Sequence, residues 1–232
     1  MNTAARKDEL DPLHYCETWP SLRSATGRVD VHSLAAFWVC ESRIAGDYFE
    51  FGVASGRSAV SAMRAASLYR YQVPAHFHLF DSFEGLPALQ TRDIGSLQFK
   101  EGDYAHARKT VQANFEERGV WNPERISFYE GWFEKVLTPE LQRTFAPGCA
   151  AIVHVDCDLY ESTRTVLDFV TPLLQPGTIV LFDDWNCFHA SYSAGERRAT
   201  AEWLARDDTP WVLEHYVSYG WHGAGFIVDG KY

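Results

Sequence analysis

The stretch Ala150-Ala151-Ile152-Val153-His154-Val155-Asp156-Cys157-Asp158 joins a short apolar run to two carboxylates. A second apolar run, Thr178-Ile179-Val180-Leu181, leads in the same way to Asp183 and Asp184. Short apolar runs of this kind are typical of buried strands. Neighbouring strands of an open parallel sheet form a ligand-binding crevice at their carboxyl ends. The two stretches therefore predict a parallel sheet with a ligand site at the edge where these carboxylates meet.

Predicted strands and helices alternate along the rest of the chain. Apolar residues at helical spacing predict helices at residues 31–43, 58–71, 107–119, 163–174 and 196–205. Short apolar runs predict strands at residues 48–53, 76–80, 126–130, 150–153, 178–181, 211–216 and 225–228. The alternation predicts an α/β fold with a doubly wound, mostly parallel sheet that helices cover on both faces, and an antiparallel edge from the last strands. The long segment 83–104 is typical of a lid or a binding loop.

The composition and charge limit the classes of partner. The chain has 232 residues, 46% of them hydrophobic, which fits one domain with a full core. It carries 21 basic and 31 acidic residues, for a formal net charge of −10. An acidic chain lacks the excess of Lys and Arg that neutralises phosphates. We therefore expect neither nucleic acid nor an anionic membrane surface among its partners.

The cysteines and the first residues indicate a cytoplasmic protein. The five cysteines include no CxxC pair, and their odd number is not typical of a disulfide framework or a zinc site. This usage fits a reducing compartment. The first residues hold no apolar segment of the kind found in a signal peptide, and no apolar run has the length needed to cross a bilayer.

A glycine-bearing turn lies between the strand predicted at residues 48–53 and the helix that follows. Its sequence is Glu50-Phe51-Gly52-Val53-Ala54-Ser55-Gly56-Arg57-Ser58. Glycines let the backbone approach a ligand closely, and a helix N-terminus offers free N–H groups. The spacing matches neither the GxGxxG dinucleotide pattern nor the GxSxG nucleophile elbow. Asp81, at the tip of the next strand, is placed to accept hydrogen bonds from ribose hydroxyls. Together these features predict a nucleoside that carries an amino-acid tail, and the alternative is a merely tight turn.

The carboxylates that follow the two central strands have more than one interpretation. Asp156, Asp158, Asp183 and Asp184 repel one another at close range unless a cation lies between them, and a hard divalent metal prefers such oxygen ligands. The alternative is that Asp158 and the Asp183-Asp184 pair cap the N-termini of helices. Asp156-Cys157-Asp158 also matches the DxD string with which metal-dependent glycosyltransferases hold a sugar nucleotide.

Several motifs, taken in order, resemble those of a known family. They are Glu50-Phe51-Gly52-Val53-x-x-Gly56-x-Ser58, Met63-Arg64-Ala65, Asp81-Ser82-Phe83-Glu84-Gly85-Leu86-Pro87, Asp156-x-Asp158-Leu159-Tyr160-Glu161-Ser162-Thr163, Pro176-Gly177 and Asp183-Asp184. Residues 46–205 resemble the macrocin O-methyltransferase (TylF-type) family, whose members use S-adenosylmethionine and a divalent cation to methylate sugar hydroxyls of natural products. The chain departs from the family at Cys157, commonly Gly, at Trp185, commonly Tyr, and at Ala54-Ser55, commonly Trp-Gly.

The resemblance implies a Rossmann-like S-adenosylmethionine-dependent methyltransferase domain at residues 46–232. An N-terminal arm and cap helix would precede it at residues 1–45, and the family often forms homodimers through such elements. The implied cofactors are S-adenosylmethionine and Mg²⁺, or another hard divalent cation, and the implied partner is a small-molecule acceptor.

The resemblance also implies roles for single residues. Asp156, Asp183 and Asp184 would ligate the metal, and Asp158 would be the general base. The residues expected to bind the methyl donor are Glu50 at its amino group or the surrounding waters, Asp81 at its ribose, Gly131 and Trp132 near its adenine, and Gly52, Ser58 and Ser82. The alternative for Trp132 is a place in the core.

Three other functions stay open from the sequence. The DxD string favours a metal-dependent glycosyltransferase, against which stand the glycine turn and the lack of obvious diphosphate-binding cations. A non-catalytic small-molecule sensor would not need a base such as Asp158. A third alternative uses the donor for N-methylation or cyclisation. The segments 83–104 and 185–195 and the arm before residue 31 are expected to shape the acceptor pocket.

The remaining polar residues near these motifs receive simpler interpretations. His154 lies inside a predicted strand and is interpreted as a satisfied core residue. His189 and His222 are candidate acceptor contacts. Arg197 and Arg198 are interpreted as part of a solvated helix face.

Overall fold

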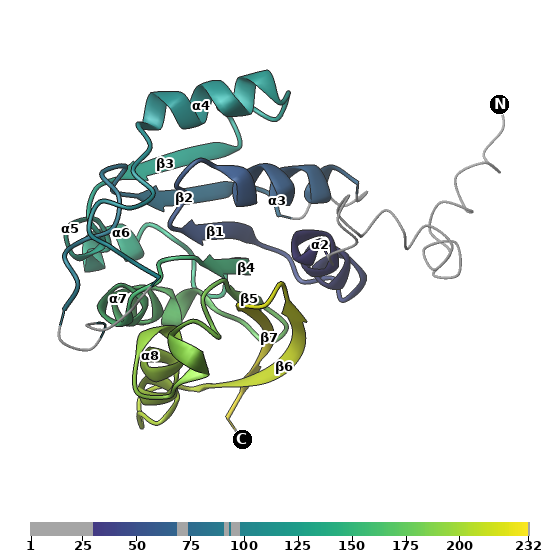
Figure 1. Ribbon diagram of the computed structural model, residues 1–232. Helices are drawn as coiled ribbons and strands as arrows, with labels where there is room; N and C mark the ends of the chain where they lie inside the picture. The colour runs from purple at the N-terminus through teal and green to yellow at the C-terminus, as the bar shows by residue number, and fades with distance from the viewer. Residues whose placement is uncertain (1–29, 69–73, 91–92, 94–97, 232) are drawn as a thin grey trace, which may run out of the picture.

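The computed structural model describes residues 30–68, 74–90, 93 and 98–231, which form a single seven-stranded sheet with helices on both faces (Figure 1). The predicted arm at residues 1–28 and the end of the helix predicted at 58–71 lie outside the described residues. The strands are β1 (Asp47–Phe51), β2 (Phe77–Asp81), β3 (Ile126–Glu130), β4 (Ala150–Val155), β5 (Ile179–Phe182), β6 (Trp211–Tyr219) and β7 (Gly223–Gly230). The helices are α2 (Val31–Glu41), α3 (Arg57–Ser67), α4 (Arg108–Glu117), α5 (Phe133–Val136), α6 (Pro139–Gln142), α7 (Tyr160–Val170) and α8 (Gly195–Leu204).

The sheet has the strand order β3-β2-β1-β4-β5-β7-β6, and β1 to β5 are parallel. This confirms the predicted doubly wound, mostly parallel α/β fold. The antiparallel strand is β7, which pairs with β5 on one side and with β6 on the other. Strand β7 therefore lies one place inside the sheet edge, and β6 forms the edge. The tight turn after Tyr219 joins β6 to β7, and such a turn can join only antiparallel neighbours.

Two hydrophobic layers follow from the alternation of side chains along the strands. In β1, Tyr48 packs into the layer that contains α2, α3 and α4, and Phe49 packs into the layer that contains α7 and α8. Figure 1 shows these two groups of helices on opposite faces of the sheet. Both layers leave the carboxyl ends of the parallel strands uncovered by core, which is where the site is built.

Helix α2 is part of the layer that covers the sheet. The Asp30 carboxylate caps its first turn by accepting a hydrogen bond from the backbone N–H of His32 (3.2 Å). At the other end the Trp38 indole donates to the carbonyl of Gly177 (2.9 Å). The division of the chain into residues 1–45 and 46–232 stays a prediction.

Some elements begin or end away from their predicted positions. The helix predicted at residues 163–174 begins at Tyr160, because the Asp93 carboxylate accepts hydrogen bonds from the Tyr160 N–H at 3.2 and 3.3 Å. This partner comes from the distant loop after β2, so local spacing did not reveal it. The four-residue helices α5 and α6 were not predicted, since one helical turn is too short to show an apolar period.

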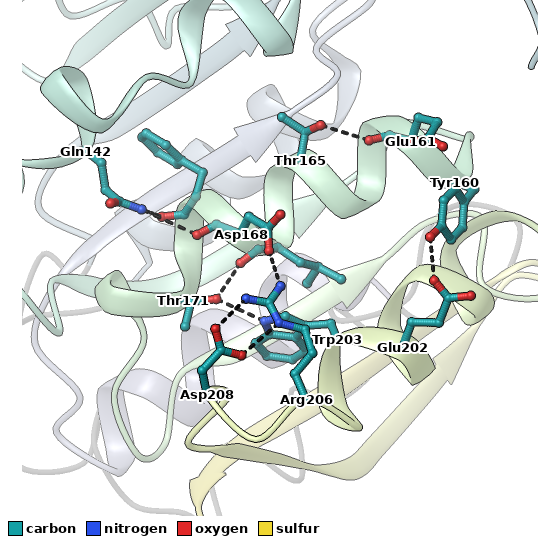
Figure 2. Close-up of polar contacts among 12 residues, drawn as sticks. Gln142, Tyr160, Glu161, Thr165, Asp168, Thr171, Glu202, Trp203, Arg206 and Asp208 are labelled. Carbon is teal, nitrogen blue, oxygen red and sulfur yellow. Dashed lines mark hydrogen bonds and ion pairs between the residues drawn. The ribbon is translucent and has the colours of Figure 1, made fainter.

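Polar contacts hold α8 against α7 and its continuation (Figure 2). The Trp203 indole donates to the Thr171 hydroxyl (2.9 Å), and the Tyr160 hydroxyl donates to the Glu202 carboxylate. The Arg206 guanidinium bridges the carboxylates of Asp168 and Asp208. These contacts hold the last turn of α8 and the residues after it against α7 and its continuation. Among the described residues, no helix is long and apolar enough to cross a membrane.

Candidate active site

A cavity of about 520 Å³ lies at the carboxyl ends of β1, β2, β4 and β5. Every residue predicted to bind the donor, to ligate the metal or to act as the base lines it, except Glu50. These residues are Gly52, Ser58, Asp81, Ser82, Gly131, Trp132, Asp156, Asp158, Asp183 and Asp184. The two candidate acceptor contacts, His189 and His222, do not line the cavity. The fold therefore brings together, in one cavity, residues that are distributed over more than a hundred positions of the sequence.

Three carboxylates converge on one side of this cavity. Asp156, Asp183 and Asp184 each offer an oxygen, and these oxygens all lie within 4.8 Å of one another. The sheet register explains the meeting, because Val155 of β4 pairs with Phe182 of β5, so the residues that follow stand at the same level. The backbone N–H of Asp183 donates to the carbonyl of Val155 (3.0 Å), which extends that register by one residue.

The electrostatics of the cluster favour a bound cation. Burial, and then repulsion from Asp183 and Asp184, raises the pKa of Asp156 well above its usual range. Burial and the charge of Asp183 also raise the pKa of Asp184. Burial acts in the same direction on Asp183, but interaction with His154 and His222 outweighs it, so the pKa of Asp183 is lowered. The Asp184 Oδ2 atom is buried without a hydrogen-bond partner among the described residues. A hard divalent cation would satisfy that oxygen and remove the repulsion.

Asp158 lies beside the three converging carboxylates in a strained conformation. Its φ is 60°, in the left-handed region that few side chains adopt. Burial, and then repulsion from Asp184, raises the pKa of Asp158 well above its usual range. The residue that caps α7 is Leu159, without a side-chain hydrogen bond. The interpretation of Asp158 as a helix cap is therefore wrong.

The Asp183-Asp184 pair does not cap a helix either. The next helical turn, at Phe188–Ala190, is preceded by Cys187, and α8 is preceded by Ala194. Strain and burial at acids without a capping role are typical of functional sites.

The glycine turn lines the cavity next to Asp156. Gly52 has a φ of +91°, and Gly56, with a φ of +78°, immediately precedes α3. As a glycine, the N-cap residue Gly56 has no side chain with which to cap the first turn of α3. The Asp81 carboxylate holds the turn, because its Oδ2 accepts hydrogen bonds from the N–H groups of Val53 (2.6 Å) and Ala54 (2.8 Å). The turn is thus preorganised before any ligand binds.

Glu50 lies beneath the cavity and is fully buried. Its Oε1 accepts a hydrogen bond from the Ser58 hydroxyl (2.6 Å), and its Oε2 accepts one from the Tyr48 hydroxyl (2.6 Å). The Tyr48 oxygen also lies 3.3 Å from the His154 Nδ1 atom. His154 Nε2 in turn lies 3.9 Å from Asp183 Oδ1. This buried polar chain connects the glycine turn to the carboxylate cluster.

The structure adds functional candidates that the sequence did not mark. His154 is 1% exposed, as a core residue would be, but it lines the cavity. Strand alternation was the signal that could have found it, since residues two apart share a face and His154 stands two before Asp156. Glu196, buried at the start of α8, accepts a hydrogen bond from the Asp184 N–H (3.0 Å). Tyr104 lines the cavity while its side chain stays 53% exposed.

Other polar residues take different places from those expected. His222 lies 3.5 Å from Asp183 Oδ2 through its Nδ1, so it contacts a carboxylate of the cluster. Arg197 is not part of a solvated face, because its guanidinium donates to the Trp185 carbonyl (2.9 Å) and to Asn186 Oδ1 (2.8 Å). These hydrogen bonds connect α8 to the loop that follows Asp183 and Asp184. Arg198 pairs with Glu202 on the surface (2.8 Å).

Comparisons with known proteins agree with this geometry. The family model of the macrocin O-methyltransferases (TylF) matches residues 3–206. The chain is 32% identical, over 76% of its length, to 8-demethyl-8-(2,3-dimethoxy-alpha-L-rhamnosyl)-tetracenomycin-C 4′-O-methyltransferase of Streptomyces olivaceus. It is 26% identical, over 71% of its length, to mycinamicin III 3″-O-methyltransferase of Micromonospora griseorubida. The matched regions span 68% and 66% of these two relatives.

Solved structures show the same fold. The calicheamicin methyltransferase CalS11 superposes with a TM-score of 0.65 at 22% identity, over 85% of this chain and 77% of that one. The O-methyltransferase NovP superposes with a TM-score of 0.63 at 23% identity, over 85% of this chain and 78% of that one.

The family match decides between the functions that the sequence left open. It excludes the glycosyltransferase suggested by the DxD string, because the acids of that string stand at the edge of a methyltransferase sheet. It also sets aside the sensor and the other uses of the donor. This chain belongs to the macrocin O-methyltransferase (TylF) family and is an S-adenosylmethionine-dependent O-methyltransferase.

Proposed function

We propose that this enzyme depends on a divalent cation and methylates a sugar hydroxyl of a natural product. The observation that carries the proposal is the convergence of the Asp156, Asp183 and Asp184 oxygens within 4.8 Å, beside Asp158 and the glycine turn. The names of the two relatives, a rhamnosyl 4′-O-methyltransferase and a mycinamicin 3″-O-methyltransferase, support a glycosylated acceptor.

The three converging carboxylates would hold the cation, Mg²⁺ or another hard divalent ion. All three residues supply only oxygens, and one of those oxygens is buried without a partner among the described residues. When bound, such an ion acts as a Lewis acid and a template for the acceptor hydroxyl. The excess negative charge of the cluster is the physical reason for the expected affinity.

The glycine turn and the tips of β2 and β3 would hold the methyl donor. The uncapped first turn of α3 suits the carboxylate of the amino-acid tail, and Ser58 lies in this turn with its hydroxyl donating to Glu50. Asp81 Oδ1 keeps a lone pair for a ribose hydroxyl, since among the described residues it accepts one hydrogen bond, from the Phe83 N–H, whereas Oδ2 accepts two. Gly131 and Trp132 would lie at the adenine.

Asp158 would act as the general base. Burial and the charge of Asp184 raise its pKa, which makes the carboxylate a stronger base than an ordinary one toward the proton of a hydroxyl. The acceptor oxygen bonds to the methyl carbon as the carbon–sulfur bond breaks, and the hydroxyl proton passes to the Asp158 carboxylate. The products are the methyl ether and S-adenosylhomocysteine. Positioning of the two reactants by the cavity supplies the remaining rate enhancement.

The experiment combines binding and activity. Calorimetry with S-adenosylhomocysteine should show binding, and mass spectrometry with a panel of rhamnosylated and other deoxysugar-bearing acceptors should show addition of one methyl group. The activity should disappear in chelator and return when Mg²⁺ is restored. Absence of binding at millimolar S-adenosylhomocysteine would rule out the donor site, and full activity in chelator would rule out the cation. Sedimentation of the full chain would test whether it forms the homodimer that the family resemblance implies.

A further inference from the structure

His32 carries a buried polar atom without a partner, and that atom belongs to a residue of the cavity wall. The side chain comes from the first turn of α2, lines the cavity and is 8% exposed. Its Nε2 atom makes no hydrogen bond to any residue that the structure describes. A buried nitrogen that lacks a partner costs free energy unless a ligand or a water satisfies it. We therefore expect the Nε2 atom of His32 to bind a ligand atom in the cavity.

The surroundings of His32 decide which kind of atom that is. Burial, and then the neighbouring His154, lowers the pKa of His32 to about 3, so the ring is neutral. The two imidazole rings meet edge to face with their centroids 5.1 Å apart. The Nδ1 atom faces the Asp30 carboxylate at 3.9 Å, which favours the tautomer with its proton on Nδ1. The Nε2 atom is then an acceptor, and its partner must be a hydrogen-bond donor.

The cavity wall around His32 belongs to the proposed donor site. Helix α2 packs against α3, and the first turn of α3 brings Ser58 to the same cavity. The tail of the methyl donor carries a carboxylate, which suits that first turn, and an ammonium group, which needs an acceptor. Glu50, the acceptor expected from the sequence, does not line the cavity, and both of its oxygens already accept hydrogen bonds from hydroxyls.

We propose that His32 completes the donor site, with its Nε2 atom accepting a hydrogen bond from the ammonium group of the S-adenosylmethionine tail. The inference rests on the donor site proposed above. It places one donor contact on α2, in the segment predicted to be separate from the methyltransferase domain. Helix α2 then does more than cover the sheet, because binding of the donor joins it to α3 across the cavity.

A double-mutant cycle tests this contact. The two ligands are S-adenosylhomocysteine and its deamino analogue, which keeps the carboxylate but lacks the ammonium group, and calorimetry gives both affinities. In the unchanged enzyme the analogue should bind about 10- to 100-fold more weakly, the range for a hydrogen bond to a charged group. In His32→Phe, which keeps a ring but not the acceptor, the two ligands should bind with equal affinity. The variant should leave affinity for the deamino analogue unchanged.

Two further variants separate this role from a structural one. Ser33 lies in the same turn as His32 but does not line the cavity, and its hydroxyl donates to the Asp30 carboxylate (2.7 Å). The substitution Ser33→Ala should leave the preference for the ammonium-bearing ligand intact. His32→Gln, which offers an amide oxygen, should recover part of that preference.

The possible results separate the two proposals. If His32→Phe weakens the binding of both ligands equally, or of neither, the proposed contact between His32 and the ammonium group is wrong, while the donor site stands. If the unchanged enzyme binds neither ligand, the donor site itself is overturned.

Discussion

The α-carbon of Gly52 packs directly against the backbone carbonyl of Asp156. A β-carbon at Gly52 would overlap that carbonyl oxygen. The contact follows from the pairing of Phe51 in β1 with Val155 in β4, which brings the next residue of each strand to the same level. The turn proposed to hold the methyl donor and the first proposed metal ligand are therefore held at a fixed separation by the backbone alone.

We expect Gly52→Ala to lose both stability and donor binding. The substitution would place a side chain at a φ of +91° and force the Asp156 carbonyl to move. The left-handed conformation alone costs about 1–2 kcal/mol, and the overlap adds to it. Urea unfolding should show a loss of more than about 2 kcal/mol in the free energy of unfolding. Gly102→Ala is the matched control, because its φ is +80° and a β-carbon there would meet nothing within 4 Å. Equal losses in the two variants would contradict the contact.

We expect Asp158→Asn to abolish most of the methyltransferase activity without weakening the binding of the methyl donor. The amide cannot take up a proton, so kcat should fall by about 10²- to 10⁴-fold. The affinity for S-adenosylhomocysteine, measured by calorimetry, should stay close to that of the unchanged enzyme, because the proposed donor contacts lie elsewhere in the cavity. The exposed Asp207→Asn should change neither quantity. A parallel loss of donor affinity would show that Asp158 acts through the structure of the site.

We expect Asp156→Asn to raise the melting temperature of the cation-free protein. The substitution removes a buried charge and its repulsion with Asp183 and Asp184, which are the causes of its raised pKa. The unchanged enzyme should gain stability as Mg²⁺ is added, by about 2.7 kcal/mol at a hundred times its dissociation constant. The variant should lose most of that response. Thermal melts with and without chelator measure both effects, and an unchanged response to Mg²⁺ would exclude Asp156 as a ligand.

We expect Asp93→Ala to destabilise the protein by about 1–3 kcal/mol, because the buried N–H of Tyr160 loses its acceptor. Asp93→Asn keeps one acceptor oxygen and should lose less. Urea unfolding at neutral pH gives the two values. If both variants match the unchanged protein, Asp93 does not hold the start of α7.

The positions of the strands were predictable because buried strands have a strong local signal. Each of the seven observed strands overlaps its prediction, and the carboxylates that follow β4 and β5 were read from the same stretches. Asp156, Asp183 and Asp184 could be grouped in advance since parallel neighbours end at one edge. The beginning of α7 could not, because its N–H partner, Asp93, is distant in sequence.

The role of buried histidines could not be predicted either. A histidine in an apolar stretch looks the same in sequence whether or not its ring lines a cavity. His154 and His32 differ from ordinary core residues only because the packing of α2 against the sheet turns both rings to the cavity wall and leaves their Nε2 atoms without partners among the described residues.

The amino-acid sequence alone determined the α/β class, the family and the place of the acids at the ends of two strands, because these depend on apolar periodicity and on strings of neighbouring residues. Tertiary structure alone decided that Glu50 lies under the cavity and that α2 contributes His32 to its wall. Burial and hydrogen-bond pairing are properties of atoms that meet only after the chain has folded, so no local pattern records them.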